Sequence, residues 1–86
     1  MLARGDSVTA AQLYDRALAT YRQQDNILGQ AGIHLGIGRM EHMAGQSAKA
    51  RGQLDEALAM YRSAGSVLGE ARVLAERGDL EKDTFN

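Results

Sequence analysis

Apolar side chains recur along the chain with the spacing of one face of an α-helix. Between residues 10 and 21 the apolar positions are separated by four, three, one and three residues, and the same steps return between residues 50 and 61. On a helix of 3.6 residues per turn, each set forms a single stripe. The first stripe consists of Ala10, Tyr14, Ala17, Leu18 and Tyr21, and the second of Ala50, Leu54, Ala57, Leu58 and Tyr61.

The two stripes belong to a longer repeat with a period of forty residues. The segment ALATYRQQDNILGQA at residues 17–31 returns as ALAMYRSAGSVLGEA at residues 57–71. When residues 1–46 are laid over residues 41–86 without gaps, fourteen of the forty-six positions are identical. Shared composition alone would give about four identities, so a fixed period is the better explanation. Such a period indicates units that bury their apolar faces against one another.

The helical stripes and the residues between them predict four α-helices, at 7–24, 28–44, 47–64 and 68–82. The chain has no proline and is rich in residues that favour helix. We expect Ser7 and Ser47 to cap the helices that follow them, and Asp25-Asn26 and Gly65-Ser66 to separate neighbouring helices. Because the linkers are only two or three residues long, consecutive helices must be antiparallel. The predicted fold class is all-α, with antiparallel helical hairpins stacked as a short α-solenoid.

Ten glycines are unusual in a chain with so many helix-forming residues. Two pairs recur with the period, Gly29 with Gly69 and Gly38 with Gly78. We expect these glycines to let neighbouring helices approach closely.

These features resemble the tetratricopeptide repeat in its forty-residue form. That family has a leucine–glycine pair on the first helix, a glycine in the turn, and alanines around an aromatic residue on the second helix. Ile37-Gly38 occupies the first place, Gly45 the turn, and Ala50, Leu54 and Ala57 the last three. The chain departs from the family's pattern in three ways: leucine replaces the aromatic residue, the closing proline is missing, and a histidine stands at position 34, where a large aromatic residue is common.

The same comparison frames the whole chain, residues 1–86, as one domain: a half repeat, a full repeat and a second half repeat. The upstream copy follows the family's pattern more fully, with Gly5 as the turn and Ala10, Tyr14 and Ala17 on the second helix.

Each half repeat lacks the partner that would cover its outer face, and solenoid ends normally need capping. We expect apolar side chains to be left open at both ends: Leu13, Leu18 and Tyr21 at one, and Val73, Leu74 and Leu80 at the other. Self-association would cover them, either head to tail or as a two-fold homodimer. A position inside a longer solenoid is the alternative.

The resemblance implies a non-catalytic function in binding proteins, because the first helix of each repeat in that family lines a groove for an extended peptide or a partner helix. The positions that it places there, or that share the same stripe, are Gly32, Leu35, Gly36, Arg39 and His42, continued by Arg72, Ala75, Asp79 and Lys82. Gly32 and Gly36 each cost about 1 kcal/mol relative to Ala in a helix, which calls for a reason. Packing of a second copy is the alternative use of this face. A regulatory or sensor segment of a larger signalling or transcriptional regulator is the alternative function.

Composition and charge narrow the classes of partner. Ten basic and eleven acidic residues give 86 residues a net charge of −1, which provides no electrostatic basis for binding nucleic acid or an anionic membrane. There is no cysteine, no apolar run near the roughly 20 residues of a membrane helix, and no signal-peptide pattern at the start. We therefore expect a cytoplasmic protein.

Candidate chemistry is sparse. His34 and His42 are eight residues apart, about 12 Å along a helix, which is too far to share a metal ion. The adhesion tripeptide RGD occurs at 4–6 and 77–79, but we place Gly5 in a turn and Gly78 within a helix, so the two copies occupy different structural places. No nucleophile motif or phosphate-binding loop is present. We expect neither catalysis nor a cofactor.

Overall fold

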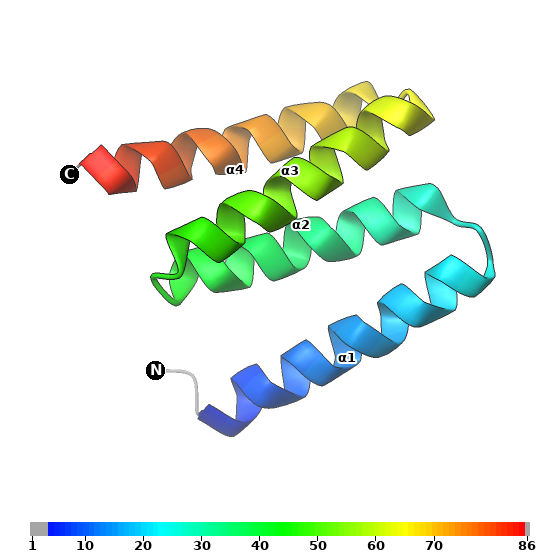
Figure 1. Ribbon diagram of the computed structural model, residues 1–86, viewed down its shortest axis with the longest axis horizontal. Coiled ribbons are helices and arrows are strands. Elements are labelled where there is room, and N and C mark those ends of the chain that lie inside the picture. Colours follow the sequence, from blue (N-terminus) through cyan, green and yellow to red (C-terminus); the bar gives the residue numbers. More distant parts are fainter. Residues whose placement is uncertain (1–3, 86) are drawn as a thin grey trace.

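The computed structural model describes residues 4–85, which form four α-helices in a zigzag (Figure 1). They are α1 (Arg4–Gln23), α2 (Ile27–Met43), α3 (Ser47–Ala64) and α4 (Val67–Phe85). No strand occurs among these residues. The all-α prediction is therefore confirmed, as are the four helices, although α1 begins three residues before its predicted start and α4 ends three residues after its predicted end.

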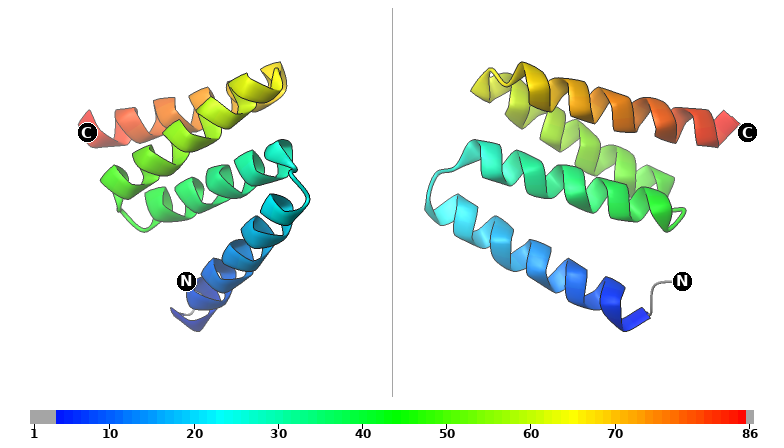
Figure 2. Two further views of the ribbon diagram at one scale, coloured as in Figure 1. Left: turned by 45° about the vertical axis from the view of Figure 1, so that its right-hand side comes forward. Right: turned by 180° about the vertical axis from the view of Figure 1, so that it is seen from behind.

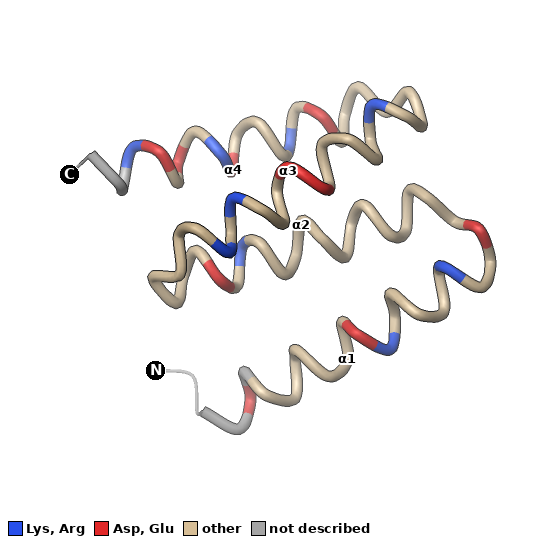
Figure 3. Tube along the Cα trace, in the orientation of Figure 1, with Lys and Arg blue, Asp and Glu red and all other residues tan. Residues whose placement is uncertain are grey.

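Helix α2 is the centre of the arrangement. It lies between α1 and α3, α4 packs against α3, and α4 also touches α2, whereas α1 and α4 make no contact with each other. From behind, α2 and α4 lie in front of α3 (Figure 2). Between Ile27 and Gly38, α2 has no Lys, Arg, Asp or Glu (Figure 3). This stretch suits the middle of a stack, because charges there would have to be buried.

The linkers confirm two of the predicted caps. The Asn26 side chain accepts a hydrogen bond from the Gly29 N–H at 2.8 Å, and the Ser66 hydroxyl accepts one from the Gly69 N–H at 3.1 Å. Gly65 ends α3 in the left-handed conformation, with φ of 72°. Residues with a side chain rarely adopt that backbone conformation, so glycine is the residue expected here.

Two other predicted caps are wrong. Ser47 lies inside α3, and the residue before it, Gln46, occupies the cap position without a side-chain hydrogen bond. Ser7 lies inside α1, because that helix begins at Arg4. For the same reason Gly5 is helical rather than a turn, so both RGD tripeptides lie in helices. Gly45, by contrast, has a φ of 77° and forms the predicted turn.

Tyrosine packed over glycine occurs at both hairpin contacts, α1 with α2 and α3 with α4. A Cβ atom added to Gly29 would overlap the ring of Tyr21, and one added to Gly69 would overlap the ring of Tyr61. The two tyrosines are forty residues apart and have equivalent surroundings, so the structure preserves the period seen in the sequence. Each glycine allows a flat ring to approach the next helix backbone.

The second recurring pair of glycines diverges. Gly38 is buried, and an added Cβ atom would lie 2.9 Å from a Leu54 methyl carbon, so α2 and α3 are close here. Gly78 has no neighbour within 4 Å of the same position. The expectation that Gly78 mediates close packing is wrong within this chain, because no described helix lies beside α4 on that side.

The core gathers around α3. Its buried apolar residues are Leu18, Ala31, Leu35, Ala50, Leu54, Ala57, Leu58, Tyr61, Val73 and Leu80. Three side chains expected to be open at the ends, Leu18, Val73 and Leu80, are therefore buried, and Tyr21 is partly covered by packing on α2. These side chains are covered by other helices of the same chain. Leu13 and Leu74 remain open, as expected.

A polar pair lies within the α2–α3 contact. The Nδ1 of His34, a buried side chain, donates a hydrogen bond of 2.7 Å to the Gln53 Oε1 atom. The His34 Nε2 atom is also buried, and no described group hydrogen-bonds to it. His34 is thus a packing residue with a specific polar partner.

Two glycine-to-alanine substitutions should have opposite effects on stability. In Gly69→Ala the new methyl group must displace the buried Tyr61 ring, and we expect a loss of about 1–3 kcal/mol in the free energy of unfolding. Gly52 lies in α3 with open space around it, so Gly52→Ala should add about 0.5–1 kcal/mol. Urea unfolding followed by circular dichroism measures both changes. Equal effects would contradict the close tyrosine–glycine contact.

The His34–Gln53 pair can be tested with a double-mutant cycle. Gln53→Leu alone leaves the buried imidazole without an acceptor, and we expect a loss of about 1–3 kcal/mol. Adding His34→Leu removes the remaining polar group and should bring stability back to within about 1 kcal/mol of the unaltered protein. Thermal and urea unfolding of Gln53→Leu, of His34→Leu and of the double variant measure the coupling. Additive losses would show that the two side chains do not interact.

Candidate functional site

The predicted partner-binding residues do not all share one open surface. Most of them are exposed on α2 and α4, namely Gly32, Arg39, Arg72, Ala75, Asp79 and Lys82. The other three are wholly or partly covered, each by a different neighbour. The stripe predicted from the sequence therefore includes both solvent-exposed residues and residues in helix–helix contacts.

Two residues of the stripe are used internally. Leu35 is 4% exposed and belongs to the core, so it is not available to a partner. Gly36 lies under Tyr14 of α1, whose hydroxyl oxygen would be 2.9 Å from an added Cβ atom. Gly36 thus admits the Tyr14 ring, which explains its presence in a helix. Helical spacing alone did not show that α1 covers this part of α2.

Glu76 of α4 links α4 to α2. One of its carboxylate oxygens accepts from the Arg39 Nε–H at 2.9 Å, and the other accepts from the His42 Nδ1 at 3.0 Å. The His42 and Glu76 side chains are 14% and 18% exposed, so this contact is partly shielded from water, whereas Arg39 is half exposed. Glu76 was not among the predicted residues, because charge pairing between separate helices leaves no mark in a spacing pattern.

A groove of about 700 Å³ opens between α1 and the C-terminal half of α2. The two helices meet at their linker and diverge toward the start of α1 (Figures 1 and 2). The lining includes Ala10 and Tyr14 of α1, and Gly36, Arg39, Met40 and Met43 of α2. Only Gly36 and Arg39 were predicted as site residues. The other four have ordinary core-type identities, which do not distinguish an open position from a filled one.

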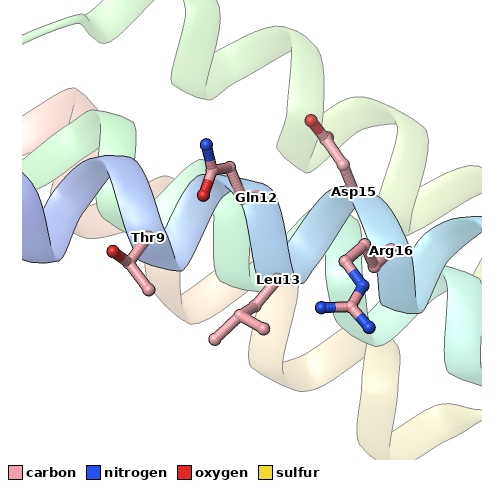
Figure 4. Close-up of a pocket in the computed structure, with 5 residues that line it drawn as sticks. All are labelled: Thr9, Gln12, Leu13, Asp15 and Arg16. Carbon is pink, nitrogen blue, oxygen red and sulfur yellow. The ribbon is translucent and has the colours of Figure 1, made fainter.

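A shallower hollow of about 470 Å³ lies on α1 around Leu13 (Figure 4). The Thr9, Leu13 and Arg16 side chains project from one edge of the helix, and Gln12 and Asp15 from the other. Leu13 is 56% exposed. The exposed apolar surface of α1 thus extends beyond the groove.

The forty-residue period allows the groove to be compared with its counterpart between α3 and α4. Ala10, Tyr14 and Met40 correspond to Ala50, Leu54 and Leu80, all of which are 0% exposed. In that second place α2 supplies the covering helix. Gly38 of α2 touches Leu54, and Arg39 and His42 reach Glu76 on the far side. The groove between α1 and α2 is therefore the open counterpart of a place that a helix fills between α3 and α4.

Among residues 4–85, no group of three or more His, Cys, Asp or Glu side chains could hold a metal ion. None of the four described helices is both long and apolar enough to cross a membrane. Comparisons with known proteins give no match: no family model, curated protein or solved structure matches the chain.

Loss of the Glu76 carboxylate should loosen α4 from α2. We expect Glu76→Ala to lower the free energy of unfolding by about 1 kcal/mol, mostly through the shielded His42 contact, since exposed ion pairs contribute little. Glu56→Ala, on an exposed face of α3, is the matched control and should have almost no effect. Equal stability of the two variants in urea unfolding would contradict a stabilising role for Glu76.

Proposed function

We propose that the protein is a non-catalytic interaction module, similar to tetratricopeptide repeats, that receives a partner helix in the groove between α1 and α2. The observation that carries this proposal is the comparison within the chain. The position between α3 and α4 is filled by α2, whereas the equivalent position between α1 and α2 is open. An open surface at the position equivalent to one that a helix fills favours a helix as its occupant.

The chemistry of the groove supports a helix as the ligand. Ala10, Tyr14, Met40 and Met43 provide an apolar floor and wall, and Met43 is among the most exposed apolar side chains of the described residues. An amphipathic helix binds such a groove through apolar residues spaced three and four apart. Methionine suits this task because its flexible thioether adapts to the shape of the ligand.

Polar groups at the edge of the groove would orient the ligand. Arg39, Glu41 and Gln46 are the charged and amide residues of the lining, and polar residues commonly accompany the apolar centres of protein interfaces. The exposed face formed by Gly32, Arg72 and Asp79 is a separate surface, and the resemblance would place an extended peptide there. Arg39 lies beside both surfaces. The other residues belong to one surface only, so mutation can distinguish the two.

A displayed library of amphipathic helical peptides tests the proposal. We expect selected peptides to bind the intact chain, and Ala10→Arg to weaken binding at least about tenfold, because the long side chain would occupy the groove. Ala19→Arg is the matched control, since Ala19 is exposed on the same helix and its repeat mate Ala59 is exposed as well. Isothermal titration with the purified variants measures the affinities.

The same titration includes Arg72→Glu. If Arg72→Glu weakens binding and Ala10→Arg does not, the ligand binds the α2–α4 face, and the groove is the wrong site. Failure to select any binder would contradict the proposed function itself. Circular dichroism of each variant confirms that its helices remain folded.

A further inference from the structure

The forty-residue period relates the two outer helices to a closed contact inside the molecule. Helix α1 is the counterpart of α3, and α4 is the counterpart of α2. The α2–α3 pair is closed, with Ala31, Leu35 and Leu54 in its shared core. Helices α4 and α1 do not touch within one chain, so the corresponding faces of both remain open. Those faces can be compared with α2 and α3 position by position.

The most informative comparison concerns the polar pair of the α2–α3 contact. His34 and Gln53 meet at 2.7 Å across the internal contact, and their counterparts are Leu74 and Leu13. Both leucines are conspicuously exposed, at 47% and 56%. Both members of the pair are thus apolar at the corresponding positions, although these lie on separate helices that do not touch within one chain. A direct Leu74–Leu13 contact between two copies would bury both leucines.

Small residues are retained at the other positions of the contact. Ala31 and Gly38 correspond to Ala71 and Gly78, and Ala57 corresponds to Ala17. The open space found beside Gly78 is the place that Leu54 and the backbone of Ala50 occupy beside Gly38. The outer face of α4 therefore keeps the features that allow a neighbouring helix to approach closely.

The largest size changes are of opposite sign. Leu54 of the internal contact corresponds to the bulkier Tyr14, while Leu35 corresponds to the smaller Ala75. The larger ring at residue 14 therefore makes up part of the volume that is missing at residue 75.

We propose that the occupant of the groove is α4 of a second copy, which packs on α1 and α2 of its neighbour as α2 packs on α3 and α4. This inference rests on the proposed function and names the partner of the same groove. Leu74 of one copy would contact Leu13 of the next, and Gly78 would lie over Tyr14. Each copy would contribute α4 to one contact and the groove between α1 and α2 to another. Because the two surfaces differ, the contact is heterologous and continues from copy to copy.

The proposed contact is mainly apolar. The counterpart of Glu76 is Gly36, so the carboxylate that joins α4 to Arg39 and His42 is not repeated between copies. We therefore expect the association to be reversible and to change little with salt concentration, since ion pairs are the contacts that salt screens.

Sedimentation velocity over a wide range of protein concentrations tests the contact. The intact chain should form dimers and larger species as its concentration rises. Leu13→Asp and Leu74→Asp should each weaken association at least about tenfold, because a carboxylate would be buried against a leucine. Both positions are exposed in one chain, so the variants should stay folded.

Leu68→Asp is the matched control on α4. Leu68 is 63% exposed, more than Leu74, yet its counterpart Leu28 stays 50% exposed beside the closed α2–α3 contact. Residue 68 therefore lies outside the proposed interface. Val8→Asp is the control on α1, since Val8 is exposed and its counterpart Ala48 is exposed as well. Both controls should associate as the intact chain does.

Mixing the two defective chains gives the decisive result. A Leu13→Asp chain keeps a working α4 and a Leu74→Asp chain keeps a working α1, so the mixture should form a one-to-one dimer and nothing larger. A two-fold dimer predicts no such complementation. A mixture that stays monomeric, a single variant that still forms the dimer, or controls that are equally defective would each overturn the head-to-tail contact.

The peptide titration separates this inference from the proposed function. If the intact chain remains a monomer at all concentrations while Ala10→Arg still abolishes peptide binding, the second copy is the wrong occupant and the interaction module stands. If neither association nor peptide binding depends on Ala10, both proposals fail.

Discussion

Close approach of helix backbones is the constraint on which the structure depends. A domain of this size has a thin core, so its helices cannot be held apart by large side chains. The chain meets the constraint with small residues on one helix and broad ones on the next. Tyr21 and Tyr61 pack against Gly29 and Gly69, and Leu54 packs against Gly38. Small residues at a few helical positions therefore bring enough apolar surface together to stabilise the four helices.

Much of the fold could be predicted because periodicity is a local signal. The steps between apolar residues indicated the helices, and the recurrence of Tyr21 at Tyr61 indicated equivalent surroundings, which the structure shows. The start of α1 could not be predicted from Ser7. A serine that can cap a helix can also lie within one, and the helix extends upstream to Arg4.

The site was less predictable, because helical spacing identifies a face without identifying its neighbour. Leu35 and Arg39 lie one turn apart on α2, yet the first is buried in the core and the second is half exposed. Gly36 lies beneath a ring from α1, and Glu76 pairs with residues more than thirty positions away. These facts depend on how the helices cross, which a single-helix pattern does not contain.

A helix held on one side only is the weakest member of a stack. Within the chain α1 touches α2 alone, whereas α2 is in contact with all three other helices. In repeat architectures stability is close to a sum over neighbouring contacts, so segments with fewer neighbours open first. Detachment of α1 would uncover Gly36 and the adjoining side of α2 while α3 and α4 remained paired. We therefore expect the contact between α1 and α2 to open before the contacts of α3, and a ligand in the adjoining groove would hold α1 against α2.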